Sequence, residues 1–226
     1  SENHTRVIPS IFILKNMKKL RFLLPLLTAL LLVGCQDDLG ITGDTDFSTN
    51  WLGRNADFFV EKMEEAKTAI AEAKETWGED WEDHCDWRVF HSFSKPQGGC
   101  TVTDSICVFI KERGNGAGCP LYTDSVKVNY CGHLMPTENY PNGKVFDHSG
   151  LYESDDYVFN DKLSSPTSFL VSNLVEGYTT ALMRMHVGDR WLIYIPQEMG
   201  YAGSSSGVLL PYSTLVFDTQ LKAYWR

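Results

Sequence analysis

Hydrophobic residues recur at helical spacing between residues 55 and 77, and most positions between them are charged. The apolar stripe consists of Phe59, Met63, Ala66, Ile70, Ala73 and Trp77. This period predicts an amphipathic helix over 55–77, which Gly78 is suited to end. An isolated helix of this length gains most of its stability from docking its apolar stripe. We therefore expect it to pack on the domain that follows; a homodimer formed through the 55–77 helix is the alternative.

After this helix the hydrophobic period changes to the alternation that is typical of strands. A short strand is expected at 87–93, before a turn at 96–99. Further alternating segments at 106–111, 125–131, 191–195 and 215–222 predict strands, and apolar spacing over 175–185 predicts one short helix. Strands with a single short helix and no βαβ rhythm indicate an α+β fold, an antiparallel sheet wrapped around a short α-helix with an N-terminal helical extension.

The first fifty residues have the pattern of an export signal. Residues 17–21 are basic at three of five positions, residues 22–33 are apolar, and Gly34 precedes Cys35. The apolar run is shorter than the roughly 20 residues that a membrane span requires, so we interpret residues 1–34 as upstream residues and a signal peptide. The Gly34–Cys35 step resembles a bacterial lipobox, which implies lipidation of Cys35. Residues 35–50, rich in Gly, Asp, Ser and Thr, would then form a flexible tether.

That resemblance implies a lipid-anchored protein of the bacterial cell envelope, at the outer membrane and either periplasmic or surface-exposed. The acidic run after Cys35 resembles the surface-export signal of Bacteroidetes lipoproteins, and an ordinary solvated tether fits it equally well. The formal net charge of the whole chain is −9. It becomes more negative when residues 1–35 are removed, because that segment carries five basic residues and one acidic residue. Such a surface argues against nucleic acid as a partner.

The cysteines beyond the lipobox do not define a metal site. They are Cys85, Cys100, Cys107, Cys119 and Cys131, an odd number, and their disulfide pairing cannot be derived from spacing. A metal site would recruit His84, Cys85, His91 and Cys100. Since no CxxC pair and no HxxxH helix supports it, we expect no metal.

Four segments in the second half of the chain resemble the FKBP-type peptidyl-prolyl cis-trans isomerases. In chain order they are IKERGNGAGCPLYTDSVKVNYCG (110–132), NGKVFDHS (142–149), LVEGYTTALMRMHVGDRW (174–191) and LLPYSTLVFD (209–218). The resemblance implies an FKBP-type isomerase domain over 104–226, preceded by a helix plus short strand extension over 51–103. It also implies binding of Xaa-Pro segments in unfolded or extended polypeptides and of macrolide ligands, without a cofactor.

The resemblance also implies which residues form the site. An aromatic box around the proline ring would consist of Tyr130, Phe146, Tyr178 and Phe217, extended by Phe169, Leu174 and Leu209. The backbone N–H of Val175 would hold a substrate carbonyl, Tyr201 would donate its hydroxyl to another, and Asp147 would orient polar groups at the rim.

The chain departs from the family pattern at several places. Tyr178 stands where the family usually has tryptophan, and its hydroxyl needs a partner when buried. Thr167 replaces a usual aromatic residue. The loops 133–143 and 149–165 are longer than usual, and the second is expected to be a lid or partner site, or a decorated surface loop. Two other functions are therefore open: a non-catalytic chaperone or binding module on the same fold, and a surface protein whose insertions recognise a glycan or protein.

Overall fold

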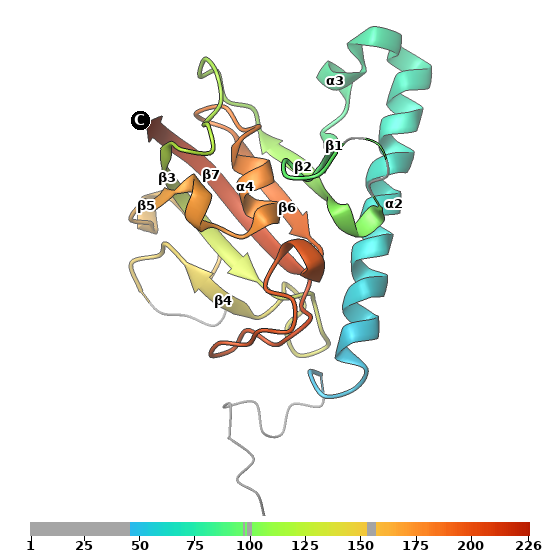
Figure 1. Cartoon of the computed structure of the whole chain (residues 1–226), viewed down its shortest axis with the longest axis vertical. Coiled ribbons are helices and arrows are strands. Elements are labelled where there is room, and N and C mark those ends of the chain that lie inside the picture. Colours follow the sequence, from blue (N-terminus) through green and yellow to red (C-terminus); the bar gives the residue numbers. More distant parts are fainter. Residues whose placement is uncertain (1–45, 97, 99–100, 153–156) are drawn as a thin grey trace, which may run out of the picture. The chain divides into compact units, whose positions relative to one another are not determined.

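The computed structural model describes residues 46–96, 98, 101–152 and 157–226, all within one compact unit (Figure 1). The signal peptide, Cys35, most of the tether and Cys100 lie outside the described residues. The helices are α2 (Trp51–Trp77), α3 (Trp81–His84) and α4 (Glu176–Leu182). The strands are β1 (Trp87–His91), β2 (Ser105–Glu112), β3 (Ser125–His133), β4 (Val145–His148), β5 (Thr167–Leu170), β6 (Arg190–Ile195) and β7 (Leu215–Trp225).

The strands form one antiparallel sheet. Its order is β1-β2-β6-β7-β3-β4, and β5 also pairs with β3. The α+β prediction is therefore confirmed, although the four-residue strands β4 and β5 were not anticipated. Since β1 pairs with β2 along its whole length, residues 87–91 extend the same sheet as residues 105–225.

The two longer helices lie on opposite faces of this sheet. Strand β2 shows it, because Ile106 and Val108 pack in the cluster of α4 residues whereas Cys107 packs in the cluster of α2 residues. Successive side chains of a strand point to opposite faces of the sheet, so these neighbouring residues of β2 pack on opposite sides of it. Gly177 lets α4 approach the sheet closely: a Cβ there would lie 2.3 Å from a methyl carbon of Ile195.

Helix α2 docks on the sheet as the apolar stripe predicted. Phe59, Met63 and Ala66 are at most 2% exposed and pack in one cluster with Tyr194 and Val216. Whether a homodimer also forms through this helix stays untested.

Buried hydrogen bonds attach the first turns of α2 to the segment before β7, and the helix begins at Trp51, before its predicted start. The side-chain oxygen of Asn55 accepts a hydrogen bond from the Thr214 backbone N–H (2.8 Å), and the backbone carbonyl of Asn55 accepts one from the Thr214 hydroxyl (2.9 Å). The indole N–H of Trp51 donates to Ser213 Oγ (3.1 Å).

One residue of the predicted stripe was assigned wrongly. Trp77, the last residue of α2, is 50% exposed and stacks on His84 with ring centroids 3.8 Å apart. The helix ends at Gly78, whose φ of 58° suits glycine, and the chain turns back through α3. Trp77 therefore meets this turn instead of the sheet.

Three further features of the described part of the chain bear on function. No helix in it combines the length and hydropathy that a membrane span requires. Its cysteines Cys85, Cys107, Cys119 and Cys131 are free thiols. No three of its His, Cys, Asp or Glu side chains converge as metal ligands.

We predict that Met63→Ala lowers the free energy of unfolding by about 2–5 kcal/mol, because it empties a fully buried site between α2 and the sheet. Urea unfolding followed by circular dichroism measures the change. Glu75→Ala, at an exposed position of the same helix, serves as control and should change stability by no more than about 0.5 kcal/mol. Equal effects of the two substitutions would contradict this docking.

Candidate functional site

Aromatic side chains from four strands and α4 converge on the α4 face of the sheet. Phe217 of β7 lies at the centre of this aromatic cluster, which consists of Tyr130, Phe146, Phe169, Tyr178 and Phe217. The Phe217 ring stacks on Tyr178 with centroids 4.6 Å apart, meets Phe146 edge to face at 5.5 Å, and lies 6.4 Å from Tyr130. Phe169 meets the far side of Tyr130 at 5.7 Å.

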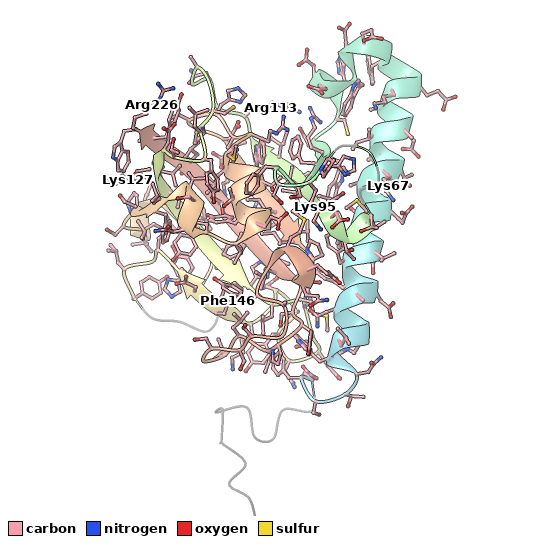
Figure 2. The ribbon with its side chains drawn as sticks, in the orientation of Figure 1. Lys67, Lys95, Arg113, Lys127, Phe146 and Arg226 are labelled. Carbon is pink, nitrogen blue, oxygen red and sulfur yellow. The ribbon has the colours of Figure 1, made fainter. Side chains whose placement is uncertain are left out.

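The cluster reaches from the core to the surface. Tyr178, Phe217 and Tyr130 are buried, whereas Phe146 and Phe169 are only half-buried. Figure 2 shows Phe146 beside β4. The five rings predicted separately along the chain are therefore in one place, with a buried floor and accessible walls.

Gly132 is a site residue that the sequence reasoning missed. A Cβ on Gly132 would lie 2.7 Å from Phe146 Cζ and 2.7 Å from Phe217 Cε1. Such distances are shorter than any ordinary contact, so only glycine lets the two rings approach β3 this closely. A glycine within a strand is the signal that could have indicated a close approach of other groups.

The hydroxyl of Tyr178 has the partner that its burial requires. It lies 3.0 Å from Thr219 Oγ1, and both side chains are at least 98% buried. Burial raises the pKa of Tyr178, so the hydroxyl stays protonated. Thr219, two residues after Phe217 on β7, was also missed. The substitution of the usual tryptophan therefore leaves an aromatic floor with a satisfied polar atom.

Polar groups gather at the rim around Asp147. The Tyr130 hydroxyl donates to Asp147 Oδ2 at 2.9 Å. Burial and the Asp147 charge raise the pKa of Tyr130, and the same two causes raise that of Tyr201, which is 43% exposed. The Asp147 carboxylate therefore lies close enough to influence both phenols.

The remaining predicted residues lie in or against the main core cluster, which also contains Tyr130, Tyr178 and Phe217. Val175 directly precedes α4 with an extended backbone (φ −61°, ψ 148°). Leu174 and Val175 are half-buried against the main core cluster, and Leu209 belongs to that cluster with 6% exposure. The structure thus joins the five rings, Asp147 and Tyr201 in one region and places Leu174, Val175 and Leu209 at the main core, while the roles of all ten residues stay predictions.

Tyr157, within the 149–165 insertion, lies on the face of the sheet opposite the aromatic cluster, whereas Ser149 at the start of the insertion accepts a hydrogen bond from the Tyr130 backbone N–H. Tyr157 stacks on His148 at 4.3 Å, and its carbonyl accepts a hydrogen bond from the Cys131 thiol. Because Cys131 follows Tyr130 on β3, it faces the opposite side of the sheet. For this insertion the lid, the partner site and the decorated surface loop stay predictions, and its residues 157–159 lie on the face of the sheet opposite the aromatic cluster. These residues border a separate cavity of about 630 Å³ that no residue of the aromatic cluster lines.

Comparison with known proteins finds similarity to the same family in the second half of the chain. Residues 119–222 match the family model described as FKBP-type peptidyl-prolyl cis-trans isomerase. The FKBP-type 22 kDa peptidyl-prolyl cis-trans isomerase of Escherichia coli (strain K12) is 34% identical over 125 residues, 54% of this chain and 52% of that protein. The macrophage infectivity potentiator of Trypanosoma cruzi is 34% identical over 110 residues, 48% and 47% of the two chains.

A further relative is the outer membrane protein MIP of Legionella longbeachae, 31% identical over 135 residues, 59% of this chain and 50% of that protein. The chain spans about half the length of these curated relatives. The resemblance to the FKBP-type isomerases is thus confirmed for the second half of the chain.

We predict that Tyr178→Phe lowers the free energy of unfolding by about 1–3 kcal/mol, because it leaves the buried Thr219 hydroxyl without its partner. Adding Thr219→Val removes both polar atoms and should recover most of the loss. Urea unfolding of the two variants and the wild type measures this. A double variant less stable than Tyr178→Phe would show that the pair does not act as a unit.

Proposed function

We propose that this chain, which carries a domain of the FKBP-type peptidyl-prolyl cis-trans isomerases, catalyses cis–trans isomerisation of Xaa-Pro bonds in polypeptides. The observation that carries the proposal is the aromatic cluster around Phe217, with a buried floor, accessible walls and the Asp147–Tyr130 pair at its rim. The family match over residues 119–222 supports it independently.

An apolar, water-excluding pocket is sufficient for this reaction. Rotation about an Xaa-Pro bond meets a barrier of about 18–20 kcal/mol, because it breaks amide resonance. Water stabilises the planar, more dipolar amide better than the twisted one. Transfer of the bond from water to a site lined by rings therefore disfavours the ground state relative to the transition state. No nucleophile, cofactor or proton transfer is needed.

The residues of the cluster take distinct roles in this proposal. The rings of Tyr178 and Phe217 form the floor under the proline ring, and Phe146 forms a wall. The Val175 backbone N–H binds a substrate carbonyl beyond the proline, and the exposed Tyr201 hydroxyl donates to a second one. Asp147 is a positioning residue, because its carboxylate holds the Tyr130 hydroxyl. A macrolide would compete with the peptide for the same rings.

The same proposal places the protein in the bacterial cell envelope, lipid-anchored through Cys35 and assisting protein folding there. Its support is the basic, apolar, Gly-Cys order of residues 17–35 and the name of the Legionella relative as an outer membrane protein. Mass spectrometry of the protein from cell membranes tests it: an acylated N-terminal Cys35 is expected, and an unmodified chain that starts elsewhere would overturn the anchor.

We predict that Phe146→Ala lowers kcat/KM for a short Xaa-Pro peptide at least tenfold, about 1.4 kcal/mol of transition-state stabilisation, because it opens one wall of the pocket to water. A protease-coupled or exchange-NMR isomerase assay measures it. Tyr122→Ala, which removes an exposed ring that contacts Phe93, is the matched control and should retain activity.

Two results would overturn the isomerase proposal. One is a wild-type protein that does not accelerate the exchange, and the other is equal activity of Phe146→Ala and wild type. Suppression of aggregation of an unfolded client by an inactive wild-type protein would favour the chaperone alternative.

A further inference from the structure

A cavity of about 630 Å³ lies on the face of the sheet opposite the aromatic cluster, and we call it the rear cavity. Four parts of the chain surround it: α2, the rear faces of β2, β3, β6 and β7, the segment 136–145, and residues 157–159. Both of the lengthened loops and the N-terminal helix therefore meet here. Its size falls within the roughly 300–1,000 Å³ of ligand pockets.

The rear cavity is separate from the proposed isomerase site because strands alternate. Cys131 and Asp218 line the cavity, whereas their neighbours Tyr130 and Phe217 belong to the aromatic cluster. A ligand in one site therefore contacts a different set of side chains from a ligand in the other.

The cavity wall is mainly apolar and aromatic. The rings that line it are Phe58, Tyr140, Tyr157, Phe159 and Tyr194, with aliphatic groups of β6 and β7 between them. Tyr157 is 4% and Tyr194 is 8% exposed, so these rings are core residues that also face the cavity. Such a lining accepts an apolar body.

One hydroxyl in this wall has no protein partner. Tyr194 as a residue is 8% exposed, its hydroxyl is not fully enclosed, and no group in the described part of the chain forms a hydrogen bond with it. Burial raises its pKa, so it remains a donor. Because this hydroxyl keeps some exposure and has no protein partner, an acceptor on a ligand in the cavity can reach it.

The charged groups of the lining favour an anion. Lys62 and Lys111 line the cavity together with a single carboxylate, Asp218. Asp218 is already bound by Lys111 (2.8 Å) and by the Arg190 guanidinium (2.8 and 2.9 Å). Lys62 donates to Glu65, and each ammonium carries three donors, so both lysines keep donors for a ligand.

His133 adds no charge to this balance. Its Nδ1 donates to the Leu134 carbonyl at 3.1 Å, and burial lowers its pKa, which favours the neutral ring. The lining therefore carries a net positive charge in a chain whose formal net charge is −9. The lysine side chains are 22% and 37% exposed, whereas Tyr157 and Tyr194 are buried, so the ammonium groups are more accessible to solvent than these two rings.

We propose that the rear cavity is a second ligand site that binds an amphipathic carboxylate of the fatty-acid class. The apolar chain lies against the rings, and the carboxylate accepts hydrogen bonds from Tyr194 and from Lys62 and Lys111 at the mouth. This site is independent of isomerisation.

Isothermal titration calorimetry of the purified protein with dodecanoate, below its micellar concentration, tests the site. We expect saturable binding of one molecule per chain and at least a tenfold weaker affinity for dodecylammonium, which has the same chain and the opposite charge. Phe146→Ala should bind dodecanoate as wild type does, because Phe146 belongs to the other face.

Variants then test the assigned contacts. The Lys62→Gln, Lys111→Gln double variant should lose the preference for the anion, and Tyr194→Phe should weaken binding roughly fivefold. Lys67→Gln, on α2 outside the lining, is the matched control and should bind as wild type does (Figure 2).

Three results would overturn the proposal whether or not every variant folds. They are the absence of saturable dodecanoate binding to wild type, equal affinity of wild type for dodecylammonium, and loss of binding in a Phe146→Ala variant whose circular dichroism matches wild type, which would place the ligand in the aromatic cluster. Unchanged selectivity in a folded lysine double variant would remove the lysines from the site.

Discussion

The two-residue period of the central strands β3 and β7 is the constraint on which the rest of the structure depends. It places Tyr130 and Phe217 on one face and Cys131 and Asp218 on the other. Both faces of the sheet carry apolar side chains, and each face is stable only when another element packs against it. Helix α4 covers one face and α2 the other, and a potential site forms beside each helix.

On the α4 face, close packing and polar satisfaction act together. The missing side chain of Gly132 lets two rings approach the backbone, and the Thr219 hydroxyl lets a tyrosine serve as the floor. Both features bring the rings together beside the backbone of β3. The carboxylate of Asp147 accepts a hydrogen bond from the Tyr130 hydroxyl and remains exposed.

On the opposite face, segments that lie far apart in the chain contribute to one space. Phe58 comes from α2, Tyr140 and Tyr157 come from the two long loops, and Tyr194 comes from the sheet. The charges in this space are balanced locally around Asp218, with a lysine and an arginine on one carboxylate. The lengthened loops therefore do more than decorate the surface, because they build a cavity with its own chemistry.

The sequence by itself determined the class of fold and most members of the aromatic cluster. Periodicity is a local property, so it predicted α2, the longer strands and α4, and the four motifs carried Tyr130, Phe146, Tyr178 and Phe217. Tertiary structure alone decided what each side chain meets. The exposure of Trp77, the Tyr178–Thr219 bond, the role of Gly132 and the convergence of both long loops behind the sheet arise from contacts between distant segments. Such contacts depend on register and on packing in three dimensions, and neither is encoded in the spacing of a single segment.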